Sequence, residues 1–229
     1  MWSLEGKTAL VTGGGKGIGR AIALALSARG VRVVVTGRQE RALGETVGEI
    51  AHGGGKARHL AGDVRDPKHL AAAVERAVET FGGLDLVIAN AGLPGRVELG
   101  AADLAAAEAV LHTNLMGAYY TFNAAVPRMK GPGRLIAVGN ALSEVGAPGY
   151  AAYCASKAGI LGLCRAVAHE VAPRKITCNA VVPGFLQEDG VEFSRSPLGR
   201  RVEPEEVAAL VVFLCSAAAD VVTGQALSV

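Results

Sequence analysis

Aromatic residues are scarce in this chain of 229 residues, which also has few cysteines and no long apolar run. Phe, Trp and Tyr supply 4% of the sequence although half of it is apolar, so a core must be built from Ala, Val, Leu and Ile. Such side chains suit a parallel sheet that helices bury on both faces. The length is enough for one large α/β domain and too short for two.

Excess charge of one sign is also lacking. The formal net charge is +2 and no basic run exceeds two residues, which gives no electrostatic support for a nucleic-acid or membrane partner. No apolar segment reaches membrane-spanning length, and the N-terminus has no basic region followed by an apolar core. We therefore expect a cytoplasmic protein.

Metal-ligand spacings are absent as well. The four cysteines show no C-x-x-C pattern, and the five histidines are scattered without a repeated carboxylate beside them. Free thiols in a reducing compartment, and no metal site, are the expectation.

Short apolar segments alternate with amphipathic ones along the whole chain. Strands are predicted at about residues 8–11, 31–35, 57–61, 84–89, 134–138, 176–182 and 226–229, with six helices between them. This alternation predicts right-handed βαβ units and hence a doubly wound, seven-stranded parallel sheet with helices on both faces. No repeat, linker or low-complexity tract divides the chain, so residues 1–229 are expected to form a single α/β domain.

A glycine cluster joins the first strand to the first helix. Gly13, Gly17 and Gly19 are spaced G-x3-G-x-G, and such glycines allow backbone to approach a pyrophosphate that rests on the helix N-terminus. The predicted dinucleotide contacts in this loop are Gly13, Gly15, Lys16, Gly17, Ile18 and Gly19.

The end of the second strand indicates which dinucleotide binds. An acidic residue there holds the ribose hydroxyls of NAD, whereas a basic one accepts the 2′-phosphate of NADP. Here the strand ends in Thr36, Gly37 and Arg38 with no carboxylate at the turn, and Lys16 offers a second cation. NADP(H) is therefore predicted over NAD(H), although both cations could be ordinary solvated side chains.

Several further motifs follow in order, and with the glycine loop they resemble the short-chain dehydrogenases/reductases, especially 3-oxoacyl-acyl-carrier-protein reductase-like members. The resemblance covers essentially the whole chain and implies a Rossmann fold. Its motifs are the loop from Thr12 to Gly19, Asp63 with Val64, the run Asn90, Ala91 and Gly92, then Asn114, Tyr153 with Lys157, and Pro183 with Gly184.

The resemblance implies roles for these residues. Asp63 and Val64 would contact adenine, and the other motif residues would line the cofactor site. Tyr153 would give a proton to a carbonyl oxygen, Lys157 would hold the nicotinamide ribose, and Asn114 would anchor a water. Independently, residues four apart share a helix face, and a nearby ammonium lowers the pKa of a phenol.

The sequence departs from the family pattern at two places. The catalytic serine normally lies thirteen residues before the tyrosine, and that position is Asn140. An amide can donate a hydrogen bond, but its acceptor oxygen must point away. Ser143 is an alternative donor, or simply a loop residue. The family threonine after Pro183 and Gly184 is replaced by Glu188, in a short substrate loop predicted at about residues 185–202.

The leading hypothesis is an NADP(H)-dependent oxidoreductase that interconverts a carbonyl and an alcohol on a small-molecule substrate. One alternative is a cofactor-binding protein with a regulatory role. Another is lyase, isomerase or cyclase chemistry that uses Tyr153 and Lys157. By resemblance, a homodimer or homotetramer would form through the long helices expected at about residues 101–127 and 149–172.

Overall fold

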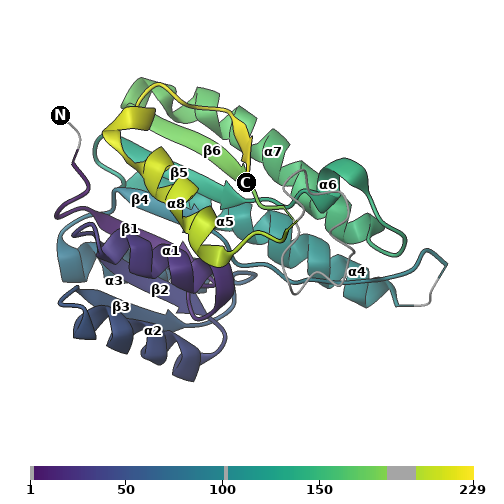
Figure 1. Ribbon diagram of the computed structural model, residues 1–229, viewed down its shortest axis with the longest axis horizontal. Coiled ribbons are helices and arrows are strands. Elements are labelled where there is room, and N and C mark those ends of the chain that lie inside the picture. Colours follow the sequence, from purple (N-terminus) through teal and green to yellow (C-terminus); the bar gives the residue numbers. More distant parts are fainter. Residues whose placement is uncertain (1–2, 101–102, 185–199) are drawn as a thin grey trace.

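The computed structural model describes residues 3–100, 103–184 and 200–229, and its centre is a parallel β-sheet (Figure 1). The strands are β1 (Thr8–Thr12), β2 (Arg32–Gly37), β3 (Ala57–Ala61), β4 (Leu86–Ala89), β5 (Gly133–Val138), β6 (Ile176–Val182) and β7 (Ala226–Ser228). They lie in the order β3-β2-β1-β4-β5-β6-β7, and all six neighbouring pairs are parallel. The predicted doubly wound, seven-stranded sheet is confirmed.

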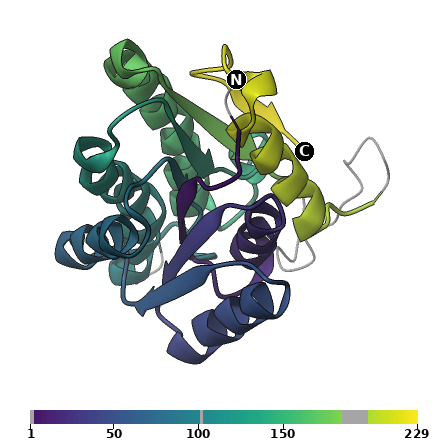
Figure 2. The same ribbon diagram turned by 90° about the vertical axis from the view of Figure 1, so that its left-hand side faces the viewer.

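Helices cover both faces of the sheet (Figures 1 and 2). They are α1 (Gly17–Ser27), α2 (Glu40–His52), α3 (Pro67–Phe81), α4 (Leu104–Leu111), α5 (Gly117–Ala125), α6 (Leu142–Val145), α7 (Ala151–Val171) and α8 (Pro204–Cys215). One core cluster joins α1, α2 and α8 to the sheet, and a second joins α3, α5 and α7 to the opposite face. Successive strand residues such as Leu10 and Val11 enter different clusters, because side chains alternate along a strand.

The order of the strands creates a switch point. The chain begins at β1, runs outward to β3, and returns to place β4 on the other side of β1. At such a point the two connections leave the carboxyl ends of β1 and β4 in opposite directions, and a crevice opens between them. The glycine loop follows β1, so it lies at this crevice.

The predicted long helix after β4 is interrupted, which corrects the sequence prediction. It consists of α4, a π-helical turn at His112–Met116, and α5, followed by a 3-10 turn at Val126–Arg128. The extra residue in a π turn widens the backbone locally. Here the widened turn carries Asn114, whose side chain bonds to the neighbouring Leu93. Hydrophobic periodicity does not report such an insertion.

Candidate active site

The glycine loop is packed too tightly for side chains at several of its positions. A Cβ added to Gly19 would lie 2.2 Å from the carbonyl oxygen of Gly13, and one added to Gly13 would lie 2.8 Å from Asn90 Nδ2. Gly13 and Gly17 have φ values of +67° and +50°, which favour glycine. A Cβ on Gly17 would instead enter open space among the described atoms, on the side where α1 begins.

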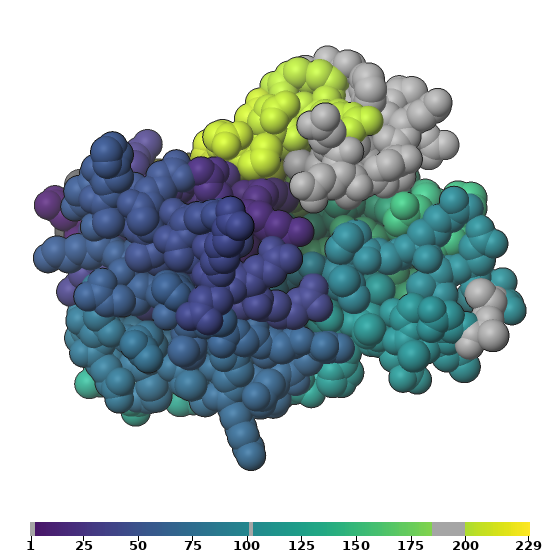
Figure 3. All heavy atoms as spheres, turned by 90° about the horizontal axis from the view of Figure 1, so that it is seen from below, coloured from purple at the N-terminus to yellow at the C-terminus, as the bar shows by residue number. Residues whose placement is uncertain are grey.

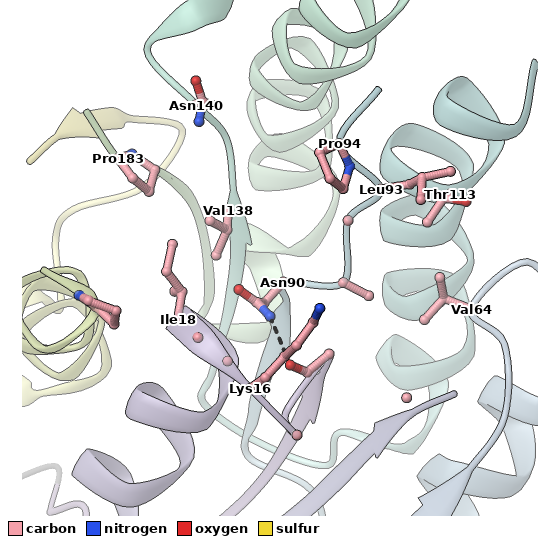
Figure 4. A pocket seen from close by; sticks show the side chains of 18 of the residues that line it. Lys16, Ile18, Val64, Asn90, Leu93, Pro94, Thr113, Val138, Asn140 and Pro183 are labelled. Carbon is pink, nitrogen blue, oxygen red and sulfur yellow. Dashed lines mark hydrogen bonds between the residues drawn. The ribbon is translucent and has the colours of Figure 1, made fainter. Parts of the chain in front are cut away.

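Asn90 braces this loop from β4. Its Nδ2 donates to the carbonyl oxygen of Thr12 at 2.9 Å and to that of Gly13 at 3.4 Å, the second of which is the dashed line in Figure 4. Thr12 Oγ1 accepts from the backbone N–H groups of Asn90 and Ala91 at 3.0 Å each. The ends of β1 and β4 are therefore tied together. The asparagine that the sequence placed in the cofactor site holds the shape of the loop.

A pocket of about 650 Å³ lies at the carboxyl ends of the strands. The surface is hollowed between the purple and blue N-terminal half and the teal segment that carries α4 (Figure 3). The predicted site residues that line the pocket are Gly13, Gly15, Lys16, Gly17, Ile18, Gly19, Arg38, Asp63, Val64, Asn90, Ala91, Gly92, Asn140, Tyr153, Lys157 and Pro183. The pocket wall thus contains sixteen of the eighteen site residues that were predicted from the sequence.

Two predicted residues stand behind the pocket within the described part of the chain. Gly184 donates its N–H to the carbonyl oxygen of Val229 at 2.8 Å, so its backbone is used to hold the C-terminal strand. Asn114 is buried in the π turn, where Oδ1 accepts from Leu93 N–H at 2.7 Å and Nδ2 donates to Ser156 Oγ at 3.0 Å. Neither side of that amide faces open space.

Ser156 was not singled out from the sequence. Its hydroxyl donates to the carbonyl oxygen of Tyr153 at 2.6 Å and accepts from Asn114, so it links the π turn to the first turn of α7. Its position directly before Lys157 in the sequence was the feature that could have pointed to this residue.

One end of the pocket is basic. Arg38 follows β2 and Lys16 belongs to the glycine loop, and both side chains are exposed. Asp63 lies beside them, but its carboxylate is occupied by Arg65, which donates from Nη2 at 2.7 Å and from its backbone N–H at 2.9 Å. The hydrogen-bonded guanidinium of Arg65 lowers the pKa of Asp63, opposed by partial burial, with a smaller contribution from Arg38. Arg65 belongs to none of the motifs recognised in the sequence.

The other end of the pocket holds Tyr153 and Lys157 from α7. Both side chains are buried, with 8% and 5% exposed. Lys157 Nζ donates to the carbonyl oxygen of Val138 at 2.8 Å and lies 5.9 Å from the centre of the Tyr153 ring. The end of β5 therefore fixes the ammonium beside the phenol.

Asn140 enters the same end of the pocket from the segment after β5. Its Oδ1 accepts the backbone N–H of Leu142 at 2.8 Å, and 3% of the residue is exposed. Figure 4 shows the amide nitrogen directed towards the pocket and the oxygen directed away. This is the orientation that the Asn140 amide needs in order to donate a hydrogen bond into the pocket.

Ser143 lies in the short helix α6 rather than in a loop, which corrects that prediction. Its hydroxyl donates to the carbonyl oxygen of Asn140 at 2.7 Å, and within the described residues it is not part of the pocket wall. A hydroxyl that completes a helical turn in this way is turned away from the pocket. Glu188 and most of the predicted substrate loop, residues 185–199, lie outside the described residues.

The described ranges contain no group of three or more His, Cys, Asp or Glu side chains that could hold a metal ion. In the same part of the chain, none of the helices combines the length and the apolar character that crossing a membrane would need.

Comparison with known proteins places the chain in a family. The family described as "Enoyl-(Acyl carrier protein) reductase" matches residues 13–229. The 3-oxoacyl-[acyl-carrier-protein] reductase FabG of Vibrio cholerae is 34% identical over 239 residues, covering 99% of this chain and 97% of that protein. The chain belongs to the short-chain dehydrogenase/reductase family of oxidoreductases, as its motifs predicted.

Other relatives show the range of this family. Cyclohexanol dehydrogenase of Acinetobacter is 37% identical over 231 residues, covering 95% of this chain and 91% of that protein. A short chain dehydrogenase of Burkholderia cenocepacia in complex with NADP is 32% identical with a TM-score of 0.94, covering 100% and 98% of the two chains. A variant of actinorhodin polyketide ketoreductase with NADPH is 32% identical with a TM-score of 0.91, covering 100% and 97%.

Proposed function

We propose that the protein is an NADP(H)-dependent oxidoreductase that interconverts a carbonyl and an alcohol, with Tyr153 as general acid and base. The observation that carries this proposal is the convergence of Tyr153, Lys157 and the Asn140 amide on one end of a pocket whose other end begins at the glycine loop. Membership of an oxidoreductase family favours this reaction over the regulatory, lyase, isomerase and cyclase alternatives.

The residues present fit a nicotinamide dinucleotide. The glycine cradle leaves open space at Gly17, and the N-cap residue Lys16 makes no side-chain capping bond, so the first N–H groups of α1 can receive a pyrophosphate. When bound, the dinucleotide supplies or accepts the hydride. Asp63 and Val64, with Ala91, Gly92 and Pro183, would form the remaining walls of its site.

NADP(H) is proposed over NAD(H) because the basic end of the pocket suits a 2′-phosphate. Arg38 and Lys16 both line it, and the carboxylate of Asp63, which lines the same pocket, is already paired with Arg65. An unpaired acid there would repel the phosphate. Two structural neighbours contain NADP or NADPH, which supports the same choice.

The proton is handled by residues of α7. In reduction, the Tyr153 hydroxyl gives its proton to the carbonyl oxygen, and in oxidation the phenolate takes it from the alcohol. Lys157 is held through Val138, and its ammonium would also donate to a ribose hydroxyl of the bound dinucleotide, as in the family that the chain belongs to. Its charge beside the ring favours the phenolate that forms. Asn114 and Ser156 fix the backbone at Tyr153.

Asn140 is proposed to take the position of the family serine as a hydrogen-bond donor. Because Leu142 N–H holds its oxygen, the Nδ2 group is presented to the substrate carbonyl. An amide nitrogen donates but does not accept, so Asn140 would polarise the carbonyl without relaying the Tyr153 proton. A preorganised donor of this kind stabilises charge that develops on the oxygen.

The test is NADPH oxidation, followed as absorbance at the nicotinamide band, over a panel of ketones, quinones and acyl thioesters. Turnover of at least one class is expected, and Tyr153→Phe should lower it by roughly 100-fold or more because the general acid is lost. NADPH affinity should stay nearly constant in this variant. Wild-type turnover in Tyr153→Phe would contradict the mechanism, and a product formed without oxidation would favour a non-redox reaction.

A homodimer or homotetramer is proposed as the working form. Leu104 and Leu111 on α4 and Tyr119 on α5 are 72%, 36% and 47% exposed, and apolar side chains gathered on one face favour a contact between copies. Light scattering at micromolar concentration should give the mass of at least two chains, and a strictly monomeric mass would contradict the proposal.

A further inference from the structure

Thr36, the fifth residue of β2, is a junction between three parts of the dinucleotide site. Its side chain is fully buried. Its carbonyl oxygen accepts the N–H of Gly14 at 3.2 Å, which joins it to the glycine loop. Its Oγ1 donates to the carbonyl oxygen of Leu60 in β3 at 2.7 Å and lies 2.6 Å from Nε2 of His69. Arg38 follows only two residues later.

The proton between Thr36 and His69 can be assigned from the chemistry of the two groups. A hydroxyl has one hydrogen, and that of Thr36 is directed to Leu60, so Oγ1 must accept from the imidazole. Burial lowers the pKa of His69, opposed by the charges of Asp66 and Asp63. The imidazole is therefore neutral near pH 7, with its single N–H on Nε2.

The His69 ring also supports the end of β3. A Cβ added to Gly62 would lie 2.1 Å from Nδ1 and 2.3 Å from Cε1 of His69, so the imidazole fills the space that a side chain at position 62 would need. Gly62 in turn donates its N–H to the carbonyl oxygen of Gly37 at 2.8 Å. The ring thus supports Gly62, which directly precedes the pocket-lining Asp63, and Gly62 in turn bonds to Gly37, which directly precedes Arg38.

We propose that His69 is a positioning residue for the 2′-phosphate end of the dinucleotide site, acting on Arg38 through Thr36 and through Gly62. The proposal rests on the NADP(H) function proposed above. His69 is absent from the pocket wall among the described residues, so it would not touch the cofactor itself.

Loss of the His69 contact should lower the affinity for NADP(H), which carries the 2′-phosphate, and not the affinity for NAD(H). The glycine loop has supports that do not involve His69, because Asn90 bonds to Thr12 and the hydroxyl of Thr46 donates to the carbonyl oxygen of Gly14 at 3.1 Å. The turn that ends in Arg38 is held through Thr36 and Gly37. Loss of the His69 contact should therefore disturb the position of Arg38 more than the position of the glycine loop.

The experiment compares the affinities of full-length variants for NADPH and NADH by fluorescence titration. His69→Leu fills the space of the imidazole but has no hydrogen-bond donor. It should lower the affinity for NADPH about fivefold, which is the equivalent of one neutral hydrogen bond of about 1 kcal/mol. NADH affinity should not change. His69→Gln should restore NADPH affinity, because its amide nitrogen can donate to Thr36. His169→Leu, on the distant end of α7, is the matched control.

A second pair of variants keeps the test independent of one substitution. Thr36→Val removes the bond to Leu60 as well and should weaken NADPH binding at least as much as His69→Leu. The double variant should lose no more NADPH affinity than Thr36→Val alone, since that substitution already removes the bond shared with His69. Gly62→Ala should be destabilised alone, because its Cβ meets the ring, and should recover in a His69→Ala background.

The outcomes separate the inference from the function on which it rests. A wild type that binds NADPH no more tightly than NADH overturns both. A wild type that prefers NADPH, with His69→Leu folded and its NADPH affinity unchanged, overturns the inference alone. So does an equal loss for both cofactors, or a glutamine variant that is no better than the leucine variant.

Discussion

The amide of Asn140 makes two separable contacts, and an acidic substitution removes one of them. Leu142 N–H occupies Oδ1, while Nδ2 faces the pocket. Asn140→Asp keeps an oxygen for Leu142 and replaces the pocket-facing nitrogen by a second oxygen. The fold should remain, and loss of the donor should lower kcat by roughly 100- to 1000-fold, or about 2.7 to 4 kcal/mol.

Two further substitutions give the expected contrast. Asn140→Ala should show a similar kinetic loss, but it also leaves the buried N–H of Leu142 without its acceptor, which should cost about 1 to 3 kcal/mol of folding stability. Asn140→Ser should keep or raise carbonyl reduction, because a hydroxyl both donates to the carbonyl and exchanges a proton with Tyr153.

The assay follows the nicotinamide absorbance for the wild type and the three variants, with thermal unfolding measured in parallel. NADPH affinity is the control and should change little in any of them. Wild-type turnover in Asn140→Asp would refute the donor role. Loss of the native reaction in Asn140→Ser, despite intact folding, would show that the asparagine serves a different reaction.

Three other predictions follow from the site. Arg38→Asp should reverse the preference for NADPH over NADH in a fluorescence titration, and equal wild-type affinities for the two would contradict the assignment. Gly19→Ala should abolish dinucleotide binding and lower stability by about 1 to 3 kcal/mol in a denaturant titration, because its Cβ would lie 2.2 Å from a carbonyl oxygen. The lowered pKa of Asp63 means that its pairing contributes stability above about pH 4, which is lost as pH falls further. Arg65→Ala should raise that pKa towards the ordinary value in a carboxyl NMR titration, and an unchanged titration would show that the pair is not formed in solution.

Features that depend on local pattern were predictable from the sequence. Alternating apolar segments predicted the seven-stranded parallel sheet that the structure contains. Tyr153 and Lys157 share a helix face by spacing alone. The glycine loop was recognisable because its residues are consecutive.

Features that depend on contacts between distant residues were not predictable. His69 and Thr36 are 33 positions apart, and their bond appears only when β2 and α3 are packed together. The orientation of the Asn140 amide depends on the backbone N–H of Leu142, which no residue type reveals. The π turn at Asn114 breaks the period on which the helix prediction relied.

The switch point between β1 and β4 separates the residues of the site into two groups along the chain. The residues proposed to select the cofactor, Lys16 and Arg38, come from the part before β4, whereas the residues proposed to carry the reaction, Asn140, Tyr153 and Lys157, come from the part after it. Substitutions at separated positions without shared partners combine additively in free energy. We therefore expect substitutions before β4 to change cofactor preference, and substitutions after it to change substrate chemistry, independently of one another.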